Sequence, residues 1–448
     1  MDRRTGLVVA AALVVVVGAL IAVVVTRRDA PPPAATTTGA PTATAPGAAP
    51  TPATTPASPA PAQPATVAVT TTVVAEGIAA PWGLAFVGDE RAYVTEQDSG
   101  RVLELPPGGP PRQVHQFSVD AAGEGGLLGV AASPSFARDG LLYAYYTAAN
   151  DNRVVRFEPG GDAEPILTGI PKATIHNGGR IAFGPDDMLY IGTGDASVGE
   201  WAQDRSSLAG KVLRITPDGR IPDDNPFDGS PVYSLGHRNV QGLAWDGDGQ
   251  LYAAEFGPDR DDEVNRIQPA GNYGWPMVTG RAGRDGLIDP VFVRQPADAS
   301  WSGAAFLVDG AIPQWDGDLF LAALRGQRLW RVSLTDAEPS AEPLLVGEFG
   351  RLRQVVQAPD GSLWVATSNR DGYGDPRPGD DRIIRLGPRT DRREGPGGVA
   401  TCPHRSNRCA NATDRRFTEA TAARRGGGPR RRRWRRRVAR SVRCRPGR

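Results

Sequence analysis

Residues 241–267 read QGLAWDGDGQLYAAEFGPDRDDEVNRI, and this stretch decides the fold because the chain repeats its pattern. The pattern is a small and apolar strand, a turn that contains Asp and Gly, a second strand rich in β-forming residues, a polar loop, and a third strand that ends in Arg and an aliphatic residue. Short apolar runs such as LYAA between turn signals are typical of strands. The stretch therefore predicts one unit of an all-β architecture.

Five further copies of the pattern begin at Trp82, Leu128, Gly179, Ser302 and Arg353, so that successive copies start 46 to 62 residues apart. Six copies with three or four strands each predict a six-bladed β-propeller over residues 66–388. Residues 66–78, TVAVTTTVVAEGI, form an extra strand, which we expect to pair with the last strand, RIIRL, and close the ring. A stacked sandwich is the alternative, and six copies of one motif make it the weaker one.

The chain before the repeats divides into two segments. Residues 6–25 form an uncharged apolar run of 20 residues between two Arg pairs, which is long enough to cross a bilayer as a helix. The residues after it offer no convincing cleavage site, so we expect residues 1–28 to be an uncleaved signal anchor, a single-pass transmembrane segment in the cell membrane. Residues 29–65, built almost wholly from Ala, Pro and Thr, predict a disordered linker that holds the propeller on the extracytoplasmic side.

The formal net charge of +1 hides two regions of opposite sign. Residues 389–448 contain 20 Arg and no Lys against four acidic residues, a net charge of +16, so the preceding 388 residues carry 1 − 16 = −15. An acidic body of this kind does not favour nucleic-acid binding. The Arg-rich tail predicts disorder and would suit an anionic polymer or lipid, but a frame-shifted end to a complete propeller is the preferred interpretation. All three cysteines lie in this tail, so no disulfide framework holds the repeats together.

Two histidines stand just ahead of a first strand, His176 in ATIHNGGRIAF and His237 in YSLGHRNVQGLAW. In a propeller such loops converge on one face around the axis, where a His can act as a general base. For each His taken alone, the preferred alternative is a hydrogen bond that stabilises a turn. Arg238 and Asn239 offer a charged fork and an amide for an anionic ligand, and a salt bridge between blades is the alternative.

Three arginines come from the last two copies. Arg351 and Arg353 alternate, so both point to one side of a strand, and Arg325 comes from the fifth copy. We expect these charges to repel one another unless an anion lies among them, which favours an anionic ligand in the channel. Gly257 and Pro258 in EFGPDRDDE offer main-chain carbonyls to a hard cation such as calcium, with an acidic surface turn as the alternative. No His/Cys cluster for zinc, phosphate loop or nucleophile elbow occurs in the sequence.

Taken together, residues 66–388 resemble the soluble pyrroloquinoline quinone-dependent glucose and aldose sugar dehydrogenases, which are six-bladed propellers. The resemblance is carried by nine motifs in the family's order, among them PWGLAF, EGGLLGVAASPSF, HNGGRIAFGPDDMLYIGTGD, GHRNVQGLAWD, EFGPDRDDEVNRIQPAGNYGWP, GDLFLAALRGQRL and GRLRQVVQAPDGSLWVAT. It implies an enzyme that oxidises an aldose at C1 to its lactone by hydride transfer to the quinone, with calcium polarising the quinone carbonyl. The implied partners are a sugar substrate and an electron acceptor.

The same resemblance implies a role for each candidate residue. His176 is the general base that removes the substrate's hydroxyl proton. The quinone is held by five residues, namely Arg238, Asn239, Arg325, Arg351 and Arg353. The carbonyls of Gly257 and Pro258 hold calcium, and Glu124 and Asp262, the latter paired with Glu263, are expected near the substrate.

Two residues depart from the family's pattern. Phe256 stands where relatives often carry His or Gln, and Trp301 gives SWSG where APSG is usual. We expect both to narrow or reshape the pocket. Two other functions stay open at this point: a propeller that binds a carbohydrate or protein partner without catalysis, and a metal-dependent lactonase, against which the Arg-rich set argues.

Overall fold

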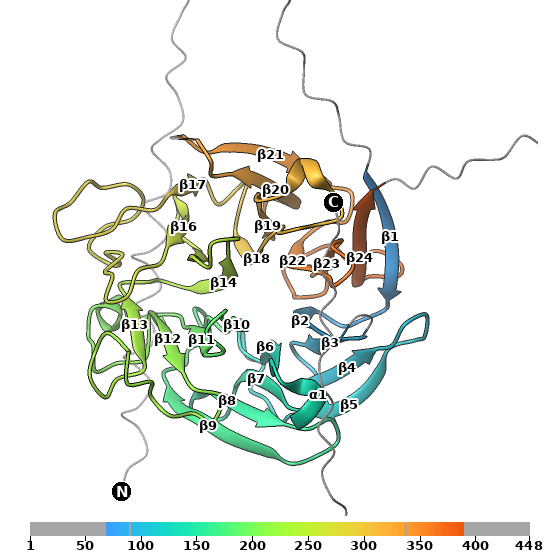
Figure 1. The fold of residues 1–448 in the computed structure, drawn as a ribbon, viewed down its shortest axis with the longest axis horizontal. Coiled ribbons are helices and arrows are strands. Elements are labelled where there is room, and N and C mark those ends of the chain that lie inside the picture. Colours follow the sequence, from blue (N-terminus) through green and yellow to red (C-terminus); the bar gives the residue numbers. More distant parts are fainter. Residues whose placement is uncertain (1–68, 89–90, 337, 389–448) are drawn as a thin grey trace, which may run out of the picture. The chain divides into compact units, whose positions relative to one another are not determined.

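The computed structural model describes residues 69–388, apart from residues 89, 90 and 337. In this part of the chain six four-stranded sheets surround a central axis (Figure 1), so the predicted six-bladed β-propeller is confirmed. No helix in it is long and apolar enough to cross a membrane. The signal anchor predicted at 1–28, the linker at 29–65 and the tail at 389–448 lie outside the described residues.

Each sheet is one antiparallel blade, and its strands are given from the axis outward. Blade 1 consists of β2 (Pro81–Val87), β3 (Arg91–Glu96), β4 (Arg101–Leu105) and β5 (Arg112–Gln116). Blade 2 consists of β6 (Leu127–Ala132), β7 (Leu142–Thr147), β8 (Asn152–Phe157) and β9 (Ala163–Ile170). Blade 3 consists of β10 (Ile181–Phe183), β11 (Leu189–Gly192), β12 (Lys211–Ile215) and β13 (Val232–Leu235).

Blade 4 consists of β14 (Val240–Trp245), β15 (Leu251–Glu255), β16 (Asp262–Arg266) and β17 (Phe292–Arg294). Blade 5 consists of β18 (Trp301–Phe306), β19 (Leu319–Ala323), β20 (Arg328–Ser333) and β21 (Ser340–Leu344). Blade 6 consists of β22 (Leu352–Gln357), β23 (Leu363–Thr367), β24 (Arg382–Pro388) and β1 (Val69–Glu76). Three short helices lie between strands: α1 (Phe136–Asp139), η1 (Gly199–Ala202) and η2 (Pro313–Trp315).

The ring closes as the sequence predicts. β1 pairs antiparallel with β24, with Val69 opposite Pro388 and Glu76 opposite Arg382, and Figure 1 shows the two strands side by side at the outer edge of blade 6. The first strand of the fold thus completes the last blade, which leaves β24 paired on both sides. This pairing protects an edge that would otherwise be open to another chain.

The core lies between neighbouring blades. One apolar cluster joins Leu128 and Tyr143 of blade 2 to Ile181 and Ile191 of blade 3, and further clusters fill other spaces between adjacent sheets. The outer strands β5, β9 and β21 are largely exposed. The outer strands are polar, whereas the faces between blades are apolar. Each repeat can therefore bury its apolar residues only by packing against a neighbouring blade.

The inner strands carry a shared irregularity that shapes the axis. In blades 1, 2, 4, 5 and 6 the register between the inner and second strands shifts, at Trp82, Leu128, Gln241, Ser302 and Arg353 respectively. A bulge bends a strand and re-aims its side chain. The irregularity therefore falls at the same place in each repeat, and residues at three of these positions line the axial cavity described below.

Two glycines beside these shifts let neighbouring inner strands approach closely. A Cβ atom on Gly83 of blade 1 would lie 2.8 Å from the backbone nitrogen of Val130 in blade 2, and one on Gly303 of blade 5 would lie 2.6 Å from Cα of Gln354 in blade 6. Backbone atoms cannot yield at such distances without a shift of the strand. Glycine is therefore required sterically where adjacent blades meet at the axis.

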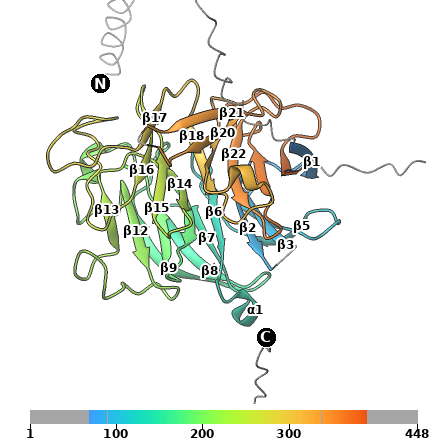
Figure 2. The same ribbon diagram turned by 45° about the horizontal axis from the view of Figure 1, so that its top comes forward.

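The topology sends two sets of loops to opposite faces of the disc. The loop after β6, which carries α1, lies at one face (Figure 2). The segments that enter the inner strands, and those that join the second strand to the third, lie at the other face. Glu124, just before β6, and Phe256, just after β15, belong to this second set.

Replacing Gly303 by Ala tests the steric requirement. The new methyl group would press on the backbone of blade 6, so we expect Gly303→Ala to lower the free energy of unfolding by about 2 kcal/mol or more. A methyl group on Gly247, in the exposed turn after β14, would meet its neighbours only at ordinary contact distances, and Gly247→Ala should stay within about 0.5 kcal/mol of the wild type. Urea unfolding of both variants measures the difference, and equal stabilities would contradict the explanation.

Candidate functional site

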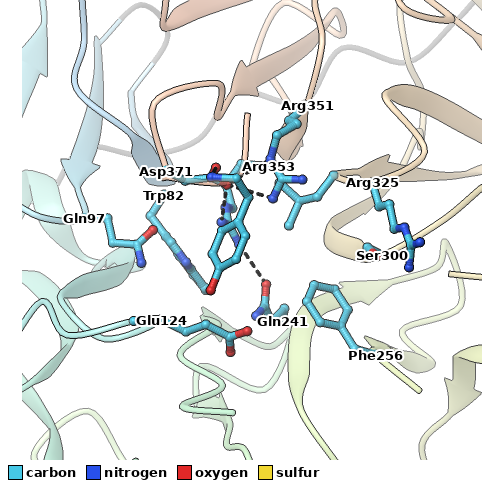
Figure 3. Close-up of a pocket in the computed structure, with 13 residues that line it drawn as sticks. Trp82, Gln97, Glu124, Gln241, Phe256, Ser300, Arg325, Arg351, Arg353 and Asp371 are labelled. Carbon is cyan, nitrogen blue, oxygen red and sulfur yellow. Dashed lines mark hydrogen bonds and ion pairs between the residues drawn. The ribbon is translucent and has the colours of Figure 1, made fainter. Parts of the chain in front are cut away.

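A cavity of about 400 Å³ opens at the axis on the face of the second loop set (Figure 3). Blades 1, 4, 5 and 6 and the loop that enters blade 2 all contribute to its wall. The side chains that matter most for its chemistry are Glu124, Arg325, Arg351, Arg353 and Asp371, together with the rings of Trp82, Phe256 and Tyr373. Residues separated by almost 300 positions in the sequence thus meet in one pocket, and its size is that of ordinary small-molecule sites.

The three predicted arginines, Arg325, Arg351 and Arg353, all line the cavity. An internal anion lies among them, which the sequence interpretation did not foresee. Oδ2 of Asp371 accepts hydrogen bonds from Nη2 of Arg351 at 2.9 Å and from Nη2 of Arg353 at 3.2 Å. Burial acts to raise the pKa of Asp371, but the two arginines outweigh it and lower the pKa. An anion thus lies between Arg351 and Arg353, as the expectation required, but it is a side chain of the protein and not a ligand.

The cavity nevertheless keeps an excess of positive charge. Among the described residues no carboxylate pairs with Arg325, and Asp371 balances only one of the other two arginines. In Figure 3, Arg325 and Glu124 lie on opposite sides of the cavity, with Arg351 and Arg353 toward Asp371. The wall thus offers a positive side for an anionic ligand and a separate carboxylate at Glu124.

His176 is not part of the cavity lining but is joined to it through Glu124, and contacts hold it on both sides. Its main-chain N–H donates to Oε2 of Glu124 at 2.8 Å, and its Nδ1 lies 2.7 Å from Oδ1 of Asp195. Its backbone adopts φ +62°, a left-handed conformation that is uncommon for residues other than glycine and that clusters at functional sites. Among the described residues, none forms a hydrogen bond with Nε2, so this nitrogen is free to meet a ligand.

Asp195 fixes the protonation pattern of this His. Its Oδ2 accepts from Nε1 of Trp275 at 2.7 Å, and its Oδ1 accepts from the main-chain N–H of Ser197 at 2.8 Å. Burial acts to raise the pKa of Asp195, but the hydrogen bonds from His176, Trp275 and Ser197 outweigh it and lower the pKa. An ionised Asp195 accepts a hydrogen bond from Nδ1–H, which leaves the lone pair of Nε2 available as a base.

The sequence interpretation missed Asp195, Trp275 and Asp371. Asp195 follows the buried strand LYIG in the same repeat as His176, and Asp371 follows the buried strand LWVAT. A carboxylate shortly after a second strand, at the face where the loops converge, was the signal available for both. No such signal marks Trp275, because it lies in a loop and does not come shortly after a second strand.

Arg238 and Asn239 lie behind the cavity wall and are not part of its lining. The main-chain N–H of Arg238 donates to Oε2 of Glu255 at 2.7 Å, and its Nη1 donates to the carbonyl of Phe256 at 3.2 Å. Oδ1 of Asn239 accepts from the main-chain N–H of Gly178 at 2.9 Å, while its buried Nδ2 has no partner among the described residues. Asn239 thus joins blade 4 to the His176 segment, whereas these contacts of Arg238 stay within blade 4. A contact between either residue and a cofactor stays a prediction.

The Gly257 loop offers main-chain oxygen atoms within a highly charged segment. No hydrogen bond from another described residue reaches the carbonyl oxygens of Gly257 or Pro258. Oδ1 of Asp262 accepts from the main-chain N–H of Gly257 at 2.8 Å and Oδ2 accepts from that of Ser300, while burial raises the pKa of Asp262 to about 6. Asp262 is buried outside the cavity lining and Glu263 accepts from the main-chain N–H of Gly280 at 2.6 Å, so a substrate contact at Asp262 stays a prediction.

The two departures from the family pattern have different outcomes. Phe256 lines the cavity, in agreement with the expectation that it shapes the pocket. Trp301 is fully buried and stacks on Phe292 with ring centroids 5.4 Å apart, inside the apolar cluster of blades 4 and 5. The expectation that Trp301 narrows the pocket is therefore wrong, and its neighbour Ser300 lines the cavity instead.

Comparison with known proteins agrees with this geometry. Residues 78–374 match the model of the family described as Glucose / Sorbosone dehydrogenase. The aldose sugar dehydrogenase YliI of Escherichia coli is 31% identical over 352 residues, which cover 69% of this chain and 92% of that protein. Quinoprotein glucose dehydrogenase B of Acinetobacter calcoaceticus is 34% identical over 46% of this chain and 52% of that protein.

A solved structure supports the same relationship. The PQQ-bound form of the aldose sugar dehydrogenase from Streptomyces coelicolor superposes with a TM-score of 0.67 and 45% sequence identity, covering 72% of this chain and 98% of that one. Together with the match over residues 78–374, these similarities show that the chain is an oxidoreductase that belongs to the glucose/sorbosone dehydrogenase family.

Proposed function

We propose that this protein oxidises an aldose at C1 to its lactone, with pyrroloquinoline quinone (PQQ) bound in the axial cavity as the hydride acceptor and calcium held by the carbonyls of Gly257 and Pro258. The observation that carries the proposal is the pairing of His176 with Asp195 next to a cavity lined by three arginines, where the lining residue Glu124 accepts a hydrogen bond from the main chain of His176. The E. coli and S. coelicolor relatives, an aldose sugar dehydrogenase in each case, support the substrate class.

The residues present fit PQQ, a flat molecule with several carboxylates. Arg325, Arg351 and Arg353 supply charge-assisted donors on one side of the cavity, and the lining rings supply flat apolar surface. Two buried polar atoms of lining residues, Nε of Arg353 and Oε1 of Gln97, have no hydrogen-bond partner among the described residues. Buried polar groups normally have partners, so these atoms are suited to a ligand that completes the site.

The fit to calcium rests on the two main-chain oxygens. The carbonyls of Gly257 and Pro258 carry no hydrogen bond from the described residues, and calcium accepts backbone oxygens. No group of three or more His, Cys, Asp or Glu side chains within the described residues is arranged to hold a metal. The remaining ligands would therefore come from the quinone and from water. The missing carboxylate cluster also weakens the lactonase alternative, which requires one.

In this proposal three residues of the chain have defined roles in catalysis and substrate binding. Nε2 of His176 takes the proton from the C1 hydroxyl, while ionised Asp195 orients the ring and stabilises the imidazolium that forms. Glu124, whose Oε1 has no partner among the described residues, would accept a hydrogen bond from a sugar hydroxyl. When bound, the quinone would supply the acceptor for the hydride that leaves C1, and calcium would polarise its carbonyl.

Replacing His176 tests the base. We expect His176→Ala to reduce kcat by about 10²–10⁴-fold, the usual contribution of a positioned base, and to leave PQQ binding unchanged. Asp195→Asn should also reduce kcat, since the amide no longer fixes the proton on Nδ1. Aldose oxidation with dye reduction and fluorescence titration with PQQ measure the two quantities, with His115→Gln in the outer strand β5 as the control. Full activity of His176→Ala would reject the assignment.

Replacing Arg351 tests the anion-binding side of the cavity. Arg351→Met removes one charge-assisted donor, and Asp371 then pairs with Arg353 alone. We expect the Kd for PQQ to rise at least about tenfold, about 1.4 kcal/mol. Arg385, a partly exposed residue of β24 paired with Asp360, provides the matched control in Arg385→Met. An unchanged Kd for Arg351→Met would remove this residue from the site.

We also propose, from the sequence alone, that residues 1–28 anchor the protein in the cell membrane with the propeller on the extracytoplasmic side. The support is the apolar run at 6–25. A chain that begins at residue 29 should move from the membrane fraction to the soluble fraction after cell lysis, whereas the full chain should stay with the membrane. Equal distribution of the two chains would contradict the anchor.

A further inference from the structure

Arg180 is a buried arginine that the proposed mechanism does not use. It lies directly before the inner strand of blade 3 and follows Gly179, which holds the place in the repeat that Trp82, Gln241 and Arg353 hold in their blades. Its side chain is 3% exposed and does not line the cavity. The guanidinium contacts two residues that do: it lies 4.2 Å from the ring centroid of Trp82, and its Nε donates to the main-chain carbonyl of Gln241 at 2.7 Å.

Its charge has no counter-charge in the protein. Within residues 69–388, leaving out 89, 90 and 337, no carboxylate forms an ion pair or hydrogen bond with Arg180, and its buried Nη2 has no partner. Burial lowers the pKa of Arg180 well below its usual value, and the neighbouring positive charge of Arg353 lowers it further. A buried charge without a partner is unfavourable, so this position costs the folded protein stability.

A second buried arginine in the same repeat shows how such a charge is usually balanced by carboxylates. Arg214 in β12 is also buried and lies 5.9 Å from an aromatic ring, that of Tyr190. Unlike Arg180, it forms ion pairs with Asp186 at 2.9 Å and Asp224 at 2.7 Å. The chain can therefore supply carboxylates to a buried arginine, and it does not do so beside the cavity.

The position of Arg180 suggests what balances it. Trp82, Gln241 and Arg353 form part of the cavity wall (Figure 3), and Arg353 in turn donates to the side chain of Gln241 at 3.0 Å. The Arg180 guanidinium thus contacts the cavity wall directly, through Trp82 and Gln241. In a poorly solvated site a charge acts across one layer of side chains, because little water screens it.

We infer that the unpaired positive charge of Arg180 attracts the anionic cofactor from behind Trp82 and Gln241, without direct contact between Arg180 and the cofactor. This inference rests on the proposed function for the identity of the ligand. The cost of burying Arg180 in the ligand-free protein is offset when a polyanion fills the cavity. The guanidinium also holds the carbonyl of Gln241 and the ring of Trp82 in place for that ligand.

The test separates this role from ordinary packing. Three variants of the full chain are compared: Arg180→Met and Arg180→Gln, which remove the charge, and Arg214→Met, which breaks a paired charge elsewhere. Tm is measured without ligand, and the Kd for PQQ is measured by fluorescence titration in the presence of calcium chloride. We expect the Kd to rise about tenfold or more for both Arg180 variants, about 1.4 kcal/mol, and to stay unchanged for Arg214→Met.

The stability readout should run in the opposite order. Tm of the ligand-free Arg180 variants should be equal to or above that of the wild type, since an unpaired buried charge is removed, whereas Arg214→Met should lower Tm by leaving two carboxylates without their partner. A fall in Tm of the Arg180 variants as large as that of Arg214→Met would make Arg180 a packing residue and overturn the inference. Unchanged Kd values would also overturn it, as would an effect confined to Arg180→Met. Failure of the wild type to bind PQQ would reject the proposed function instead.

Discussion

The structure depends on the close approach of six inner strands around one axis. Neighbouring strands come near enough at Gly83 and Gly303 that a single added methyl group would meet the backbone of the next blade. Register shifts beside these glycines turn selected side chains toward the axis. Tight packing of the blades and presentation of the site are thus one arrangement, because the residues that allow the first stand next to those that provide the second.

The site reverses the charge balance of the chain around it. Residues 1–388 are acidic overall, yet the cavity concentrates three arginines and a fourth lies just behind its wall. Asp371 offsets part of this charge by bridging Arg351 and Arg353, which orients both guanidinium groups before any ligand arrives. On the other side of the cavity, Glu124 and Asp195 hold His176 through its backbone and its ring. The cavity thus has a cationic side, and a carboxylate and an imidazole lie on the opposite side.

The sequence predicts the fold better than the site. The strand–turn–strand pattern depends on nearest neighbours in the chain, so the six repeats and the pairing of β1 with β24 could be read directly. Arg351 and Arg353, whose positions follow from the repeat pattern, also line the cavity as expected. Asp371 and Trp275 escaped prediction because their partners come from other loops or blades, at distances set by how the whole ring closes. Trp301 was misjudged for the same reason: its strand position is right, but a bulge begins at that residue and its ring packs against Phe292.

The pairing of the first strand with the last has a consequence for how the ring assembles. Val69 lies opposite Pro388, so the hydrogen-bonded edge of blade 6 joins residues more than 300 positions apart. Contacts of such separation form late, because the intervening chain must be ordered before they can be made. During synthesis from the N-terminus, β1 therefore waits as an unpaired strand until β24 has been made, and the circle becomes continuous only with the final residues of the propeller.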